Sequence, residues 1–409
     1  MRRLQSIDER TSNESNATAL RKTSAPTELI LLSIAFFLLF MGGGAQQQFV
    51  APYLEQTTTW SPVQRTCVLA MVYFSFALWR LNSAYFTHLL GERLTIVLGS
   101  FTYALFPCTL ALTRSFALLL LTAFIWGWGA ALNWNTTSIR ILNVTVRNRY
   151  GAVAGMLYGA THLGFTIGVL LLGTVLHYTN SHRTMFLIAS AIALMGCALP
   201  SMLPHTSLKY DTPSFRRLTT VLLTRYGVTI AFFLFMGAFG FGILLSSFAE
   251  LAARGATVQW FAAITALFPF ARFCVSITGG IASDKFGRGL VLAFAFALAA
   301  VALLLIALFP HSPMALGGAA LAMGIQAGIA PAIVMALVGD ITNPRERHVT
   351  YGALFIWSDL GVATAMIGSQ VLRQLMSSFR ASFVTFACIF ALCALLSIML
   401  DRWLMTNRR

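Results

Sequence analysis

Charged residues are scarce in this 409-residue sequence. Asp, Glu, Lys and Arg make up only 10% of it, against roughly one quarter of a typical soluble domain. Hydrophobic residues make up 57%, and the mean hydropathy is +0.76. This composition excludes a soluble globular domain and predicts an integral membrane protein that crosses the bilayer several times.

Motifs that carry catalytic chemistry are absent from the sequence. It contains no P-loop, no G-x-S-x-G and no H-E-x-x-H, so no site for nucleotide hydrolysis or other hydrolytic chemistry is visible. The six cysteines form no C-x-x-C pair and lie in apolar segments, without histidines at metal-ligand spacing. We therefore expect no metal and no cofactor, and we predict that the protein is not an enzyme.

Long apolar stretches dominate the chain instead. Each is about 20 residues long, enough to cross about 30 Å of hydrocarbon as a helix. We predict twelve spans: 28–50, 64–86, 94–112, 115–140, 151–176, 184–204, 223–251, 259–282, 289–309, 314–341, 350–373 and 382–404. The fold class is therefore all-α. The first 27 residues are polar and lack the apolar middle of a cleavable signal sequence, which predicts a disordered tail.

The net charge of +15 is explained by topology. If both termini are cytoplasmic, the tails and inner loops carry 20 of the 28 Lys and Arg residues, as the positive-inside rule requires. No basic surface module with aromatic residues is visible, so we expect no nucleic-acid partner. We expect a multi-pass monomer in the plasma or inner membrane, surrounded by lipid.

The sequence contains a repeat. "FFLLFMG" at 36–42 returns as "FFLFMG" at 232–237, and Glu55 and Glu250 each follow the glycine by 13 residues. "GMLYGATHLG" at 155–164 aligns with "GALFIWSDLG" at 352–361. Two parallel halves of six helices, with a site between them, are typical of an alternating-access carrier. The predicted parts are a tail (1–27), a first bundle (28–204), a cytoplasmic linker (205–222), a second bundle (223–404) and a second tail (405–409).

A charged loop follows the eighth predicted span. Its sequence, "GGIASDKFGR", resembles the signature G-x-x-x-D-(R/K)-x-G-R of the major facilitator superfamily. The match falls on Gly280, Asp284, Lys285, Gly287 and Arg288. The resemblance implies a twelve-helix carrier that moves a small solute by rocking its two halves.

The resemblance also implies a gate. Asp284 would lie against the positive N-terminal end of the fifth span and, with Arg140, would latch the inner side while the carrier is open outward. The alternative is a basic inner turn set only by topology. The equivalent loop of the first half, "AYFTHLLGERL", has His88 and Glu92 in place of Asp284 and Arg288, so this latch is expected to be one-sided.

A weaker resemblance concerns one branch of the superfamily. "LGERLTIVLGSFTYALF" at 90–106 and "GWGAALNW" at 127–134 resemble the "uncoordinated"-type relatives, which include channel regulators and a receptor chaperone. This resemblance implies an alternative function, in which the protein keeps the fold as a membrane chaperone or channel regulator without transport.

Four ionisable residues lie deep in predicted spans: Arg80, His162, Arg272 and Asp359. Such residues usually face a cavity or a partner. In one interpretation the two arginines bind an anionic or carbonyl-bearing substrate and Asp359 couples transport to protons. In the other, Arg80 and Asp359 form a structural pair between the second and eleventh helices. His162 is either a proton-coupling residue or a packing residue.

The family architecture implies that the fourth and tenth helices line the central cavity. The fourth carries Asn133, Trp134 and Asn135, and the tenth carries Gln326. Amides beside an indole suit a substrate with polar edges and an apolar face. The same amides could equally hold neighbouring helices together. The sequence therefore predicts a secondary active transporter of a small anionic or zwitterionic solute, coupled to protons.

Overall fold

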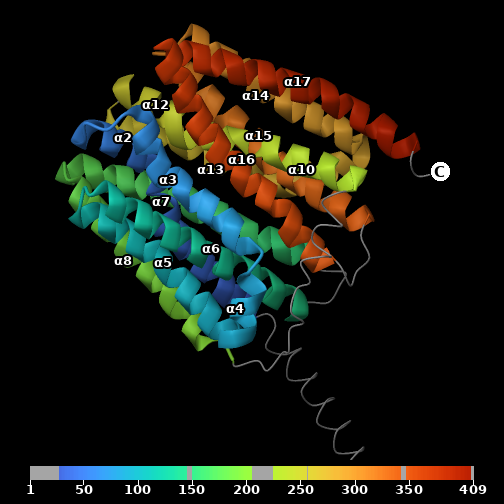
Figure 1. Ribbon diagram of the computed structural model, residues 1–409, viewed down its shortest axis with the longest axis horizontal. Coiled ribbons are helices and arrows are strands. Elements are labelled where there is room, and N and C mark those ends of the chain that lie inside the picture. Colours follow the sequence, from blue (N-terminus) through green and yellow to red (C-terminus); the bar gives the residue numbers. More distant parts are fainter. Residues whose placement is uncertain (1–26, 145–149, 205–223, 256, 342–346, 407–409) are drawn as a thin grey trace, which may run out of the picture.

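The computed structural model describes residues 27–144, 150–204, 224–255, 257–341 and 347–406, and nearly all of them are helical (Figure 1). The first membrane helix runs over Thr27–Thr57 and contains the π-helical turn η1 (Phe40–Gly44) and the helix α2 (Gln47–Thr57). It is followed by α3 (Pro62–Arg80), α4 (Ser83–Leu90), α5 (Glu92–Leu112), α6 (Phe116–Val144), α7 (Tyr150–Thr179), α8 (His182–Ala198) and the short η3 (Leu199–Met202).

The second bundle begins with an interrupted helix. It consists of α10 (Arg225–Gly237), α11 (Phe239–Ile243), η4 (Leu244–Phe248) and α12 (Ala249–Gly255). It continues with α13 (Val258–Phe286), α14 (Arg288–Leu308), α15 (Pro313–Ile341), α16 (Arg347–Met376) and α17 (Phe379–Thr406). The predicted linker at 205–222 lies outside the described residues, as do most of the two predicted tails.

Eleven of these helical segments are long and apolar enough to cross a membrane. The helix α3 completes the twelve predicted spans, although Gln64, Arg65 and Arg80 lower its hydropathy. The predicted second span, 64–86, is not one continuous helix. The chain turns at 81–82 and continues as α4, so Arg80 lies at the end of a helix.

The two six-helix bundles repeat the same contacts. In the first, α3 packs on α6 and α5 packs on α8; in the second, α13 packs on α15 and α14 packs on α17. The bundles meet through α7 against α13 and α3 against α16, which lie in the middle of the molecule in Figure 1. In each contact the second helix of one bundle (α3 or α13) packs on the fifth helix of the other (α16 or α7), as expected for a pseudo-two-fold relation.

Equivalent glycines allow close contacts within both bundles. A methyl group added at Gly164 of α7 would lie 2.2 Å from the carbonyl oxygen of Phe37, and one at Gly361 of α16 would lie 2.2 Å from that of Phe235. Only a glycine leaves room for the neighbouring backbone at this separation. The fifth helix therefore packs on the first, and the eleventh on the seventh, through a glycine at the equivalent position.

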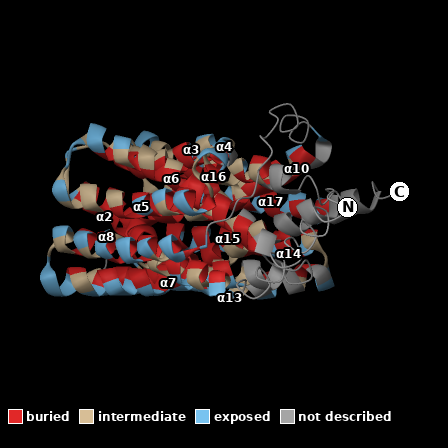
Figure 2. Ribbon diagram, turned by 90° about the horizontal axis from the view of Figure 1, so that it is seen from below, coloured by how far each residue is buried: buried red, intermediate tan, exposed pale blue. Residues whose placement is uncertain are grey.

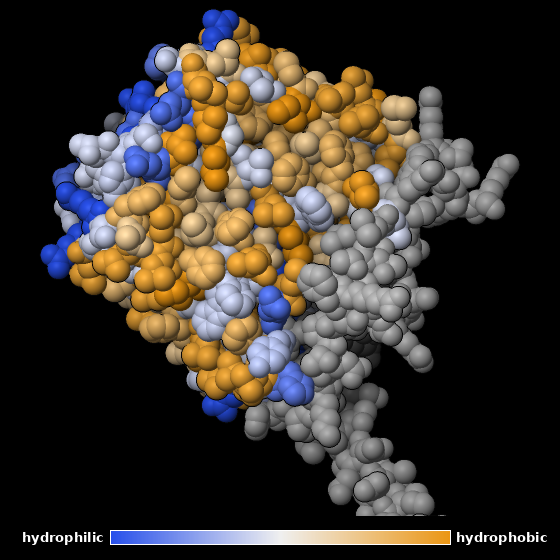
Figure 3. All heavy atoms as spheres, viewed as in Figure 1, coloured by the Kyte–Doolittle hydropathy of each residue, from blue (hydrophilic) through white to orange (hydrophobic). Residues whose placement is uncertain are grey.

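The helices turn their apolar side chains both inward and outward. Buried residues line the inside of the helix array in Figure 2, while hydrophobic side chains also cover much of the face shown in Figure 3. A surface that stays apolar is expected where lipid replaces water. We call the end where residues 58–61 connect the first two helices the outer end, following the predicted topology.

Candidate substrate site and gates

Arg80 and Asp359 connect the two bundles. Arg80 Nε lies 2.7 Å from Oδ2 of Asp359, and Nη2 lies 3.2 Å from Oδ1, so the ion pair is bidentate. Both residues are buried, at 9% and 6% exposure. The predicted pairing of the second and eleventh helices is therefore present.

Asn135 positions Arg80. Its Oδ1 accepts from Arg80 Nη1 at 3.2 Å, and its Nδ2 donates to the carbonyl oxygen of Arg80 at 3.0 Å. The guanidinium also lies over the ring of Phe76, at 4.2 Å from the centroid. Asn135 therefore contacts the ion pair only through Arg80, at the end of α3. Asn135 itself is half-buried.

Arg272 lies in the middle of α13. Its guanidinium lies 5.4 Å from the ring centroid of Phe241 and 5.8 Å from that of Phe268, and these two rings are stacked. Among the described residues, no carboxylate forms an ion pair with Arg272, and its Nε is buried without a hydrogen-bond partner. The residue as a whole keeps accessible surface.

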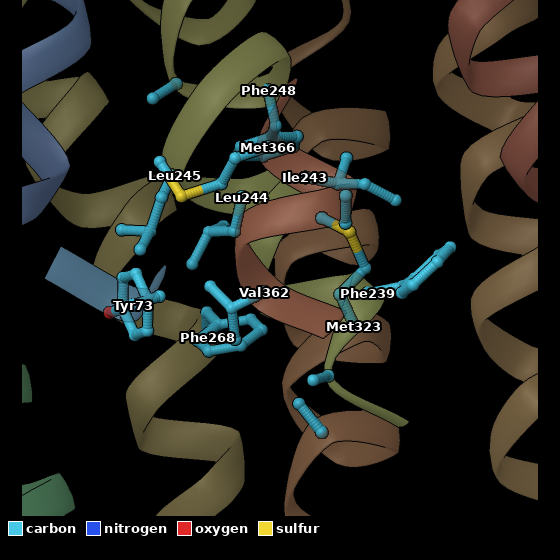
Figure 4. Close-up of a cluster of buried hydrophobic side chains, with 14 of the residues drawn as sticks. Tyr73, Phe239, Ile243, Leu244, Leu245, Phe248, Phe268, Met323, Val362 and Met366 are labelled. Carbon is cyan, nitrogen blue, oxygen red and sulfur yellow. The ribbon is translucent and has the colours of Figure 1, made fainter. Parts of the chain in front are cut away.

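Two polar residues, His162 and Tyr73, interact electrostatically with Arg272. His162, 5% exposed, lies within its electrostatic range, and its Nδ1 has no hydrogen-bond partner among the described residues. Tyr73 lies within electrostatic range of both Arg272 and Asp359, and its hydroxyl donates to Gln47 at 2.5 Å. Figure 4 shows Tyr73 and Phe268 beside a cluster of buried apolar side chains from the interrupted seventh helix and its neighbours.

Trp134 belongs to an aromatic wall beside these residues. It meets Phe36 and Phe40 edge to face, with ring centroids 4.9 and 5.7 Å apart, and Tyr158 at 5.4 Å. Trp134, Phe40 and Tyr158 all keep accessible surface. This wall lies on the first, fourth and fifth helices, with Tyr158 also within electrostatic range of Arg272.

Two predicted binding residues contact neighbouring helices. Asn133 is fully buried, packs close to Gly99 of α5, and accepts a hydrogen bond from Thr137. Gln326 is also fully buried, and its Nε2 donates to the carbonyl oxygen of Gly237 at 3.0 Å, where α10 ends. Each residue also has one buried amide atom without a hydrogen-bond partner among the described residues, Nδ2 of Asn133 and Oε1 of Gln326, so both interpretations of these amides, substrate binding and helix contact, stay predictions.

A network of charges at the outer end was not predicted as a site. Glu250 is fully buried and pairs with Arg65 at 3.2 Å and with Arg373. Glu55 pairs with Arg254 at 2.5 Å and lies 3.8 Å from Arg65 and 3.7 Å from Arg373. We call these five residues the outer network. The sequence feature that could have indicated this network is the equivalent position of Glu55 and Glu250 in the repeat.

The outer network holds the two bundles together. Glu55 and Arg65 come from the first bundle, and Glu250, Arg254 and Arg373 come from the second. The glutamines at positions 46–48, just inward of this network on the first helix, are at most 4% exposed. In this structure the outer end is therefore closed.

Arg140 is held within the first bundle. Its Nε lies 2.9 Å from Glu28 and its Nη1 lies 3.0 Å from Glu92, while its Nη2 donates to the carbonyl oxygen of Pro204. These contacts join the inner ends of the first, third, fourth and sixth helices. Glu92, which replaces the arginine of the loop signature, thus has a basic partner of its own.

The loop predicted after the eighth span is helical as far as Phe286, so the turn between α13 and α14 consists of Gly287 alone. Gly287 has φ 93° and Gly91 has φ 77°, both in the left-handed region that glycine adopts without strain, and each starts the third helix of its bundle. Lys285 is exposed, and Arg288 contacts the carbonyl oxygen of Ile333 at 3.5 Å. The surroundings of Gly280 and the side chain of Asp284 lie outside the described residues, so the predicted latch to Arg140 stays a prediction.

In the described part of the chain, no three His, Cys, Asp or Glu side chains gather as metal ligands. The arrangement instead offers cations, amides and aromatic faces. Groups of this kind can bind and orient a small solute.

Comparisons with known proteins agree with this geometry. The chain shares 28% identity over 158 residues with an uncharacterized transporter of Schizosaccharomyces pombe, covering 38% of this chain and 31% of that protein. It shares 25% identity over 233 residues with the quinolone resistance protein NorA of Staphylococcus aureus, covering 55% of this chain and 57% of NorA. The matches thus span less than two thirds of either relative.

A solved structure has the same fold. The crystal structure of the nucleoside transporter NupG superposes with a TM-score of 0.70 over 92% of this chain and 99% of NupG, at 15% identity. The family model of the Major Facilitator Superfamily matches residues 32–252 and 227–405. The resemblance to the "uncoordinated"-type branch stays a prediction, whereas the superfamily is shown: this chain belongs to the major facilitator superfamily of membrane transporters.

Proposed function

We propose that the protein is a secondary active transporter that moves a small anionic or zwitterionic solute across the membrane by alternating access, coupled to protons. Arg272 carries this proposal. A buried guanidinium is costly at membrane depth unless a negative group compensates it. No described carboxylate does so for Arg272, which favours a substrate that supplies the negative charge.

The aromatic surroundings favour a flat solute. The guanidinium of Arg272 lies near the stacked rings of Phe241 and Phe268, while Trp134 and Tyr158 keep accessible surface. Two of the similar proteins are named for quinolones and nucleosides, and both compound classes contain planar rings. We propose that the anionic group of the substrate binds Arg272 while a ring packs on this aromatic wall.

Asp359 is the proposed proton-coupling acid. Protonation of its carboxyl would remove the charge that holds Arg80, and the contact between α3 and α16 would weaken. Because α3 and α16 come from different bundles, this step would favour rocking of one bundle against the other. His162, beside Arg272, is the second candidate for carrying a proton.

Alternating access requires gates at both ends. The outer network closes the outer end here through five charges from both bundles. At the inner end we propose that Gly280, Asp284 and Lys285, near the end of α13, and Arg288, at the start of α14, form the opposing gate across Gly287 with the helix ends around Arg140. The proposal rests on the sequence signature and the matching positive φ of Gly287.

Uptake by proteoliposomes tests the transport function. Purified full-length protein would be offered mixtures of labelled carboxylates and zwitterions with a proton gradient across the vesicle membrane. We expect saturable accumulation of at least one solute, which collapses when a protonophore dissipates the gradient. Asp359→Asn should keep solute exchange but lose gradient-driven accumulation, because an amide cannot exchange the coupling proton.

The alternative function gives a different result. A folded protein that transports none of the offered solutes and co-purifies with another membrane protein would contradict the carrier proposal. It would favour the chaperone or channel-regulator function instead.

A further inference from the structure

The outer end carries an unbalanced positive charge. In the topology predicted from the sequence, six arginines lie at the outer end, but the only acidic residues there are Glu55 and Glu250. The six arginines are Arg65, Arg114, Arg183, Arg254, Arg373 and Arg380. Charge of one sign gathered on one face raises the local concentration of ligands of the opposite sign. This face is therefore suited to anions.

A pocket opens beside the outer network. It has a volume of about 250 Å³, and its lining includes Pro62, Arg254, Arg373, Ser377, Ser378 and Phe379. Two of the five network residues, Arg254 and Arg373, thus face both the network and the pocket. The volume suits a small organic anion better than a drug-sized ligand.

The two arginines are held in place by one aromatic ring. The guanidinium of Arg373 lies 3.9 Å from the ring centroid of Phe379, and that of Arg254 lies 4.9 Å from it. Stacking on a common ring fixes the planes of both guanidinium groups beside the pocket. A bidentate anion gains from donors that are already oriented.

Arg254 has unused donors. Its Nη2 donates to Glu55, but within the described parts of the chain its Nε and Nη1 donate to no residue. Its side chain is 50% exposed, whereas that of Arg373 is 11% exposed. The two glutamates of the outer network face three arginines, so the network retains one uncompensated positive charge.

The start of α17 adds further positive charge beside the pocket. Ser377 and Ser378 immediately precede α17, a helix of 28 residues, whose N-terminal end carries partial positive charge. Their hydroxyl groups can donate hydrogen bonds to a bound oxyanion. The arginine pair, the helix end and the hydroxyl groups all favour the same charge.

We propose that this outer pocket is a second anion site, which binds a small carboxylate between Arg254 and Arg373. It is separate from the proposed substrate site at Arg272, and it does not depend on the proposed transport function. An anion bound there would lie directly beside the ion pairs that close the outer end.

Saturation-transfer NMR with benzoate as the probe tests the proposal on the purified full-length protein in detergent. We expect saturable binding that weakens roughly tenfold in Arg254→Gln, because one charge-assisted hydrogen-bond donor is lost. Arg254→Lys keeps the charge but loses the planar fork, so a smaller weakening is expected. Arg380→Gln is the matched control, since it removes an exposed arginine from the same end, outside the pocket.

Three results would overturn the proposal. The first is no saturable transfer to benzoate in the unmodified protein. The second is an equal loss of affinity in Arg254→Gln and Arg380→Gln, which would indicate only a diffuse surface field. The third is unchanged affinity in Arg254→Gln together with loss in Arg272→Gln, which would place benzoate in the central site. Unchanged thermal unfolding of each variant shows that the protein remains folded.

Discussion

Arg80 on α3 and Asp359 on α16 form a buried bidentate ion pair between the two bundles, with Nε and Oδ2 2.7 Å apart. A buried pair of this kind contributes less to stability than its geometry suggests, because both charges lose their water. Removing one partner is much more harmful than removing both, since it leaves a charge alone in the protein interior.

The first prediction follows from this asymmetry. Arg80→Met should lower the free energy of unfolding by about 3–5 kcal/mol, whereas the double variant Arg80→Met with Asp359→Leu should lose far less. Thermal unfolding in detergent measures both. A double variant as unstable as the single one would show that the lost packing, rather than the unpaired carboxylate, determines the effect.

The second prediction concerns the outer network. Glu250→Gln removes the buried charge that holds Arg65 and Arg373, so the outer end should open more often. A cysteine replacing Gln48, about 10 Å inward of Glu55 along the helix, reports this opening in a variant whose native cysteines are replaced. Its labelling by a membrane-impermeant thiol reagent should become roughly tenfold faster.

The matched control for this labelling experiment is Arg380→Gln, which changes the charge of the same end outside the network. Its labelling rate should equal that of the unmodified protein. An unchanged rate in Glu250→Gln would contradict the role of the outer network as a gate.

The third prediction compares two glycines on α16. Gly361→Ala forces a methyl group against the carbonyl oxygen of Phe235, which lies 2.2 Å from the added carbon, so we expect a loss of about 1–3 kcal/mol in stability. Gly352→Ala on the same helix meets no atom within 4 Å and should be neutral or stabilising by up to about 1 kcal/mol. Equal melting temperatures for the two variants would refute the close-packing role of Gly361.

The fourth prediction separates the two readings of Gln326. Gln326→Leu removes the hydrogen bond to the carbonyl oxygen of Gly237 and leaves that buried acceptor unpaired, at a cost of about 1–3 kcal/mol. If Gln326 supports the interrupted helix, the variant should lose stability while the KM for the transported solute stays the same. A raised KM with unchanged stability would favour substrate binding.

Sequence patterns predicted the large features well. Spans of about 20 apolar residues predicted an all-α membrane fold. The repeat predicted equivalent positions for the fifth and eleventh helices, and Gly164 and Gly361 make equivalent close contacts on these helices. The pairing of Arg80 with Asp359 was predictable because two opposite charges at membrane depth have few other partners.

The details of the site depended on geometry that sequence does not contain. Asn133 and Asn135 are two residues apart on α6 and therefore point to different sides of the helix, yet nothing in the sequence tells which side faces Arg80. The outer network was missed because its ion pairs join residues such as Arg65 and Glu250, 185 positions apart. Such contacts depend on how the two bundles meet.

The most direct test of the account is the uptake of the solute selected by the proteoliposome screen into vesicles that contain Arg272→Gln. We predict at least a tenfold loss of saturable uptake, because the Arg272 guanidinium, which pairs with no carboxylate in the described parts of the chain, supplies the charge that binds the substrate. Arg380→Gln, with an exposed arginine removed, should transport normally. Uptake by Arg272→Gln with an unchanged KM and maximal rate would contradict the central claim that Arg272 binds the substrate.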